Sequence, residues 1–203
     1  MLVGASPSEA AVAVHSGWVP SLQRLAGLND SQMRAVQRYG DYVQQQRRQG
    51  TMAAQAVRYA TAQLGKPYRF GAAGPDAFDC SGLTMRAWGT AGVHLAHYVP
   101  TQYQQVRVKV PISQIKAGDL LMFDGDGHVG IAIGAKRFID APQTGENVRV
   151  DALSGWYRSN FDGAVRPAAP APESFSPGVP HDYQDVEWWR QWMAGSQEGV
   201  DRP

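Results

Sequence analysis

The sequence has little of what marks several large protein classes. Its 203 residues carry a net charge of +1, and it lacks the clustered Lys and Arg with which nucleic-acid-binding proteins neutralise phosphates. Its single cysteine, Cys80, excludes an internal disulfide framework and any zinc site made of several cysteines. No stretch approaches the ~20 apolar residues of a transmembrane helix. We therefore expect no nucleic-acid partner, no membrane span, no metal and no cofactor.

The first seven residues also lack the basic start and sustained apolar stretch of a secretory signal. If the protein acts outside the cytoplasm, we expect a processed chain or another export route. The hydrophobic content of 43% suits one domain of ordinary size with appendages.

The single cysteine lies where a helix is expected to begin. Cys80 follows the glycine- and proline-rich loop 71–75 and precedes apolar residues at helical spacing, which are Leu83, Ala87, Trp88 and Ala91. Asp79 or Ser81 could cap this helix. A thiol in the first turn feels the positive end of the helix dipole, which favours the nucleophilic thiolate. A buried structural cysteine is the alternative that this local pattern leaves open.

Helices are also expected before Cys80. The pattern predicts a short helix over residues 8–16, a longer one over 30–48 that ends at Gly50, and a third over 51–64 capped by Thr51. The buried face of the third comprises Ala53, Ala56, Val57, Ala60 and Leu64. His15, in the first, is interpreted as a surface or packing residue.

Beyond Asp119 the period changes to that of strands. Leu120–Phe123 is a short apolar run, residues 124–127 form a turn, and in 128–133 alternate residues face opposite sides. Further strands over 137–142 and 147–150 predict an antiparallel meander. Helices followed by strands indicate an α+β fold.

His128 and Asp140 are candidate partners across one hairpin of this meander. They share a face only if the loop has an odd number of residues, such as Gly134-Ala135-Lys136, or if a bulge corrects the parity. A two-residue Gly134-Ala135 turn would place them on opposite faces. A carboxylate at position 140 could orient the imidazole, and capping the turn at Pro142 is its alternative role.

Four segments together resemble a known family. They are Lys66-Pro67-Tyr68-Arg69-Phe70-Gly71, Asp79-Cys80-Ser81-Gly82-Leu83, residues 118–123 and residues 128–134. Their order and spacing are similar to those of NlpC/P60 cysteine peptidases, bacterial cell-wall hydrolases with a papain-like core. The resemblance covers roughly residues 52–167. It implies a papain-like α+β core in which N-terminal helices pack on the antiparallel meander.

The resemblance also implies roles for six residues. Cys80 would be the nucleophile and His128 the base. Asp140 would orient His128 from a position where most relatives have histidine, and the family separation of twelve residues supports the odd-loop reading. Tyr68 would help to hold the oxyanion. Asp79 and Ser81 would bind the free amine of a stem peptide, or they would only cap the helix.

Histidines 94 and 97 are interpreted as loop residues, with a substrate contact by one of them as the alternative. Many relatives carry a Pro-Arg-Thr-like segment here, whereas this chain has Val99-Pro100-Thr101 and lacks the arginine.

The implied function is hydrolysis of peptidoglycan stem peptides or muropeptides, commonly between D-glutamate and a diamino acid, in a secreted or cell-envelope protein. The alternatives are an amidase or acyltransferase on the same scaffold, a non-catalytic wall-binding module, and a contact-delivered toxin that degrades cell walls.

The expected organisation has four parts. Residues 1–50 form an N-terminal helical extension, 51–167 the catalytic domain, 168–180 a proline-rich linker and 181–203 an aromatic tail. Residues 1–50 or 181–203 could inhibit the core or dock on a partner.

Overall fold

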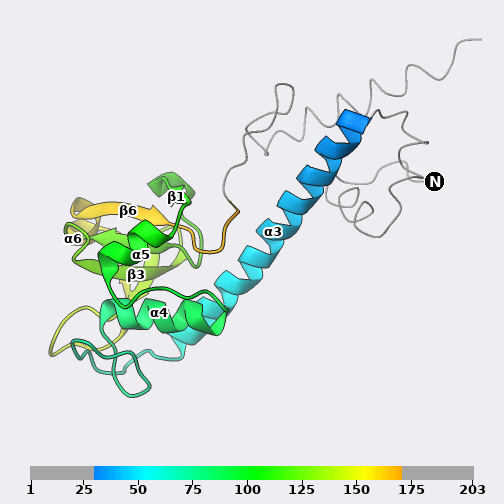
Figure 1. Cartoon of the computed structure of the whole chain (residues 1–203). Coiled ribbons are helices and arrows are strands. Elements are labelled where there is room, and N and C mark those ends of the chain that lie inside the picture. Colours follow the sequence, from blue (N-terminus) through cyan, green and yellow to red (C-terminus); the bar gives the residue numbers. More distant parts are fainter. Residues whose placement is uncertain (1–29, 171–203) are drawn as a thin grey trace, which may run out of the picture. The chain divides into compact units, whose positions relative to one another are not determined.

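The computed structural model describes residues 30–170. Its elements are α3 (Asp30–Thr61), α4 (Cys80–Thr90), α5 (Val99–Gln105), β1 (Lys109–Val110), the 3₁₀ helix η1 (Ile112–Gln114), β2 (Leu120–Phe123), β3 (His128–Gly134), β4 (Arg137–Asp140), β5 (Arg149–Ala152), α6 (Gly155–Ser159) and β6 (Phe161–Val165) (Figure 1). The expected helix over 8–16, His15 and the aromatic tail lie outside the described residues. One compact unit spans Arg47–Ala171 and contains all elements from the second half of α3 onward.

The expected break at Gly50 is wrong, because α3 runs through it without interruption. Thr51 is not a cap: it lies inside the helix, and its hydroxyl donates to the Arg47 carbonyl. A glycine costs about 1 kcal/mol relative to alanine in a helix, and tertiary packing offsets this cost. Three alanines of the next turns are buried in the core, which are Ala53, Ala56 and Ala60. Leu64, expected on the same face, lies beyond the helix end and is 40% exposed.

The strands form one antiparallel sheet in the order β1-β6-β2-β3-β4-β5. The predicted meander is confirmed for β2 to β5, and β6 returns to pair with β2. One face of the sheet contributes to the core that includes α3 and α4, through Leu120, Met122, Val129, Ile131 and Ile139. The other face carries a second cluster that includes Leu121, Phe123, Ala132 and Phe138. Helices and an antiparallel sheet together confirm the α+β class.

The β3–β4 hairpin brings His128 and Asp140 onto one face by the second of the two expected routes. Ala132 pairs with Phe138, but the register shifts before Gly134 pairs with Arg137. A bulge therefore corrects the parity of a two-residue turn at 135–136, and the turn at Gly134-Ala135 does not form.

The helix α5 follows the loop that contains His94 and His97 and was not expected from the sequence. Pro100 lies in its first turn, where the missing N–H of proline costs nothing. Within the described residues, no helix is both long enough and apolar enough to cross a membrane.

Candidate active site

Cys80 is the first residue of α4, and the predicted cap is confirmed. Asp79 adopts an extended backbone as the N-cap, and its Oδ1 accepts a hydrogen bond of 2.7 Å from the Gly82 N–H. The first N–H groups of a helix have no acceptor within the helix. Cys80, only 8% exposed, therefore lies at the positive end of a helix dipole, where the Asp79 carboxylate accepts from a free backbone N–H.

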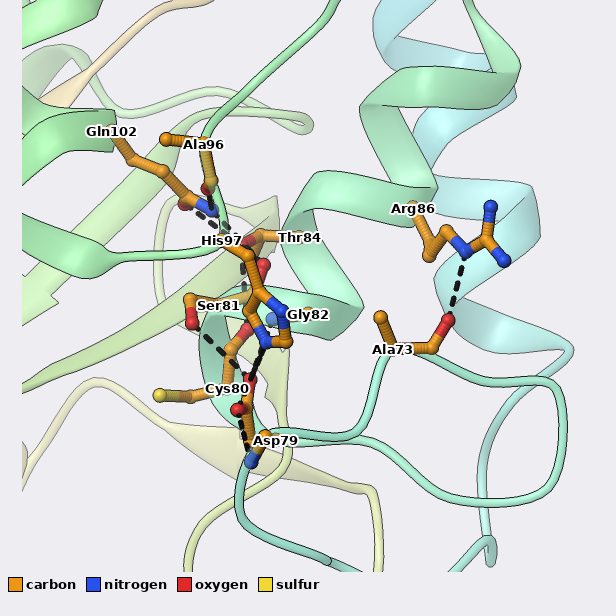
Figure 2. Close-up of polar contacts among 11 residues, drawn as sticks. Ala73, Asp79, Cys80, Ser81, Gly82, Thr84, Arg86, Ala96, His97 and Gln102 are labelled. Carbon is orange, nitrogen blue, oxygen red and sulfur yellow. Dashed lines mark hydrogen bonds and ion pairs between the residues drawn. The ribbon is translucent and has the colours of Figure 1, made fainter.

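Asp79 also joins three other parts of the chain (Figure 2). Its Oδ1 accepts from the Ser81 hydroxyl at 3.2 Å, and its Oδ2 accepts from the Gly71 N–H at 2.8 Å. The His97 Nε2 lies 2.8 Å from Oδ1 and 2.9 Å from Oδ2. Every oxygen of this buried carboxylate thus has a partner within the protein. In Figure 2 the Cys80 sulfur points away from the His97 ring.

The close approach of these segments requires glycine at position 82. A Cβ on Gly82 would lie 2.3 Å from the Ala72 carbonyl oxygen and 2.9 Å from the His97 Nε2. Both distances are shorter than real Cβ atoms show, so steric contact explains why glycine follows Ser81.

A second set of contacts fixes α4 against α5. The Gln102 side chain, fully buried, donates to the carbonyl oxygens of Ser81 at 2.9 Å and Ala96 at 2.7 Å. Its own oxygen accepts from the Thr84 hydroxyl at 2.8 Å (Figure 2). The start of α4 and the loop that carries His97 therefore hold a defined position.

His128 and Asp140 form the second histidine–aspartate pair. The His128 Nε2 lies 2.8 Å from the Asp140 Oδ2, which leaves Nδ1 as the ring nitrogen available to another group. Burial lowers the pKa of His128, but interactions with Asp140 and with Cys80 raise it by more, to about 9. The imidazolium form is thus favoured by interactions with two other side chains.

Asp140 is fully buried, and its two oxygens differ. Oδ2 accepts from His128 and from the Tyr157 hydroxyl, which lies 3.0 Å away. Oδ1 has no hydrogen-bond partner among the described residues. The pKa of Asp140 is raised overall, because burial outweighs the hydrogen bond and charge of His128, which lower it.

Tyr68 lies near Cys80, on the segment that precedes the glycine-rich loop. It is half-buried and forms an isolated parallel bridge with Phe78. Burial raises the pKa of its phenol, and the charges of Cys80 and Asp79 add to this effect. A phenol that keeps its hydrogen is a donor.

Four of the six predicted site residues come together. His128 interacts with Asp140 and with Cys80, and Tyr68 lies close enough to Cys80 for the charge of Cys80 to act on its phenol. The other two, Asp79 and Ser81, are hydrogen-bonded to each other at the start of α4. Two residues of the site, His97 and Tyr157, were not predicted from the sequence to make these contacts. The His97–Asp79 pair depends on a loop without periodicity, and the Tyr157 contact comes from a five-residue helix that no pattern indicated. Chemically, the arrangement offers a thiol, a base with an orienting acid, and a phenol donor. The described residues contain no group of three or more His, Cys, Asp or Glu that could hold a metal ion.

Comparisons with known proteins agree on the same part of the chain. The family model described as the NlpC/P60 family matches residues 65–166. A probable endopeptidase p60 of Listeria grayi is 40% identical over 113 residues, which are 53% of this chain and 22% of the relative. The peptidoglycan endopeptidase RipA of Mycobacterium tuberculosis is 37% identical over 109 residues, 46% of this chain and 23% of the relative.

This chain therefore spans under a quarter of the length of these two curated relatives. Among solved structures, the NlpC/p60 domain of the peptidoglycan hydrolase SagA is 36% identical with a TM-score of 0.51. That match covers 56% of this chain and 97% of the SagA domain. It supports the expected papain-like α+β core.

Proposed function

This chain belongs to the NlpC/P60 family, and from that premise we propose that it is a cysteine endopeptidase that hydrolyses peptidoglycan stem peptides. One observation carries the proposal most directly. Cys80 opens a capped helix, and its side chain interacts with an imidazole that Asp140 holds at 2.8 Å. The relatives named peptidoglycan endopeptidase or peptidoglycan hydrolase suggest the substrate class.

In the proposed reaction, the Cys80 thiol transfers its proton to His128 and attacks the carbonyl carbon as thiolate. His128 then gives the proton to the leaving amine as the C–N bond breaks, and a thioester to Cys80 remains. His128 next removes a proton from water, which attacks the thioester. The C–S bond breaks, the acid is released, and Cys80 is restored as the thiolate beside protonated His128. Asp140 keeps the imidazole in orientation and stabilises the imidazolium in both steps.

The tetrahedral intermediate needs hydrogen-bond donors for its oxyanion. We assign this role to the Cys80 N–H, one of the groups without an acceptor in the first turn, and to the Tyr68 hydroxyl. The raised pKa of Tyr68 supports its role as a donor, because it keeps the hydrogen on the phenol at neutral pH.

The roles of Asp79 and Ser81 in binding a stem-peptide amine remain part of the proposal. A substrate amine would have to share oxygens that already accept from Gly82, Gly71 and Ser81. The His97 ring is 29% exposed, so His97 is the partner that an incoming ammonium would most easily displace. A bound amine would then form an ion pair with Asp79 in its place.

The proposed bond is the one between D-glutamate and the diamino acid. Mass spectrometry of purified peptidoglycan fragments, after incubation with the wild type and with Cys80→Ala, tests the function and names the bond. We expect new stem-peptide fragments with the wild type alone. Parallel incubations with lipid and ester substrates distinguish the amidase or acyltransferase alternative, and tight binding without cleavage would favour a wall-binding module.

Action on peptidoglycan implies a secreted or cell-envelope location, and the toxin alternative would imply delivery to a competitor's wall. We also propose that residues 1–50 or 181–203 cover the site or dock on a partner. Because α3 is continuous and Gln49 donates to the Pro167 carbonyl, a truncation should begin at Arg47 rather than at Thr51. A folded truncation that is no more active than the full chain would exclude inhibition by the N-terminal extension.

A further inference from the structure

The Tyr157 hydroxyl lies between two carboxylates. It is 3.0 Å from Asp140 Oδ2 and 2.9 Å from Asp151 Oδ2. A phenol has one hydrogen, so it cannot donate fully to both anions. The contact with Asp140 falls on the same oxygen that holds the His128 Nε2. A change in how the Tyr157 hydrogen is shared therefore alters the strength of Asp140 Oδ2 as an acceptor for His128.

Packing fixes the position of this hydroxyl. The Tyr157 ring lies 4.8 Å from the Phe138 ring and 5.1 Å from the Phe123 ring, both in edge contacts, and 6.2 Å from the His128 ring. Asp151 pairs with Phe138 in the β4–β5 ladder, so Asp151 and Asp140 project from the same face of the sheet. The hydroxyl is thus held between them by the fold.

Charges around Asp140 come from several elements. His128 faces it from β3, and the Cys80 side chain faces His128 from α4. Arg149 pairs with Asp140 in the ladder, but its guanidinium binds Asp151 at 2.9 Å and Glu146 at 2.8 Å. Since Asp140 Oδ1 has no partner among the described residues, Oδ2 alone mediates the competition between His128 and Tyr157.

Building on the proposed function, we propose that Tyr157 is a positioning residue for His128 and that Asp151 competes with Asp140 for the Tyr157 hydrogen. A hydrogen donated to Asp140 Oδ2 weakens that oxygen as an acceptor for the imidazolium. A hydrogen drawn toward Asp151 strengthens it. Tyr157 and Asp151 therefore set, through Asp140, how firmly His128 holds its proton.

Removing the Tyr157 hydroxyl and removing the Asp151 carboxylate should shift the pKa of His128 in opposite directions. Tyr157→Phe keeps the ring and removes the competing donor, which leaves Asp140 a stronger partner for the imidazolium. Asp151→Asn removes the competing anion, which leaves the Tyr157 hydrogen to Asp140. We expect the pKa of His128 to rise by roughly half a unit in the first variant and to fall by a similar amount in the second.

NMR titration of the histidine imidazoles in the full-length chain measures these shifts. A Cys80→Ala background uncouples His128 from the thiol, and loss of one signal in His128→Gln assigns it. Tyr59→Phe is the matched control for the hydroxyl, since Tyr59 packs edge-on against Phe78 in the hydrophobic cluster that does not include Tyr157. Asp76→Asn is the control for the acid, because it removes one exposed carboxylate from the loop before α4 and leaves Arg149, Asp151 and Tyr157 as they are.

Opposite shifts in the two variants, with neither control moving, support the proposal. Equal directions, or no shift in either variant, would overturn it. Asp151→Asn keeps the aromatic packing, so it tests the proposal alone if Tyr157→Phe fails to fold. The titration needs no substrate: opposite shifts in a protein that cleaves no peptidoglycan would reject the proposed function and leave this inference standing. Where hydrolysis is measured, we expect kcat to change and KM to stay.

Discussion

The two histidine–aspartate pairs of this chain have the same geometry and different surroundings. His97 lies 2.8 Å from Asp79 and His128 lies 2.8 Å from Asp140. The His97 side chain is 29% exposed, and each oxygen of its aspartate accepts from a backbone N–H. The His128 side chain is 12% exposed, and its ring interacts with Cys80. Its aspartate is fully buried, and one oxygen of that carboxylate has no hydrogen-bond partner within residues 30–170.

Because both pairs have the same short distance, we base the proposed catalytic pair on the surroundings of each histidine. The carboxylate of Asp79 accepts hydrogen bonds from the backbone of two segments and therefore joins them, beside the amine-binding role proposed for it. The carboxylate of Asp140 is committed to one imidazole and one phenol, so it mainly affects a proton. We assign the base to His128 on these grounds, and the comparison can be tested at each of its four residues.

Replacing the two histidines should give the largest contrast. We expect His128→Ala to lower kcat/KM by on the order of 10³-fold or more, because the base and acid of both steps are lost. We expect His97→Ala to lower it by less than about 10-fold, because the backbone donors still hold Asp79. Steady-state hydrolysis of a purified muropeptide measures both. Equal losses would contradict the distinction between the pairs.

Replacing the two aspartates should separate activity from stability. Asp140→Asn is expected to lower kcat by roughly 10²-fold, the lower end for general acid–base catalysis, with little change in KM, since the imidazolium loses its charged partner. Asp79→Ala removes an N-cap and should cost about 1 kcal/mol of unfolding free energy. Kinetics and urea unfolding of both variants check this. A large loss of stability in Asp140→Asn with an unchanged kcat would reverse the assignment.

The pH dependence of stability should show a smaller effect that belongs to His128 alone. Its folded pKa of about 9 lies above the ordinary value of about 6.5, so folding favours the protonated form. That contribution is complete below about pH 6.5 and is lost as the pH rises through about 9. We expect the Tm of the wild type to fall by about 5 °C more than that of His128→Gln between pH 7 and 10. Parallel curves would reject the raised pKa.

Local patterns predicted those parts of the site that a single element determines. The start of α4 at Cys80 followed from a capping residue and helical spacing. The alternation in β3 placed His128 on one face of the strand, with Val129 and Ile131 on the other. The shared face of His128 and Asp140 required either an odd loop or a bulge, and the sequence could not choose between them. The bulge depends on pairing between strands.

Other features depend on contacts between distant segments. Gly50 does not end α3, because the buried alanines that follow it favour a continuous helix. His97 contacts Asp79 from a loop whose sequence has no helical or strand periodicity, and a Cβ at position 82 would clash with the His97 ring. Tyr157 contacts Asp140 from a helix of five residues. The contacts of His97 with Asp79 and of Tyr157 with Asp140 join residues 18 and 17 positions apart, which helix propensity and local spacing do not predict.

The central claim is that Cys80 is the nucleophile of a peptidase, and single-turnover incubation with a purified muropeptide tests it most directly. Enzyme in excess over substrate is quenched in acid, and the products and the Cys80 peptide are analysed by mass spectrometry. We predict cleaved stem peptide with the wild type and none with a folded Cys80→Ala variant. Cleavage of the same bond by Cys80→Ala at the wild-type rate would contradict the account.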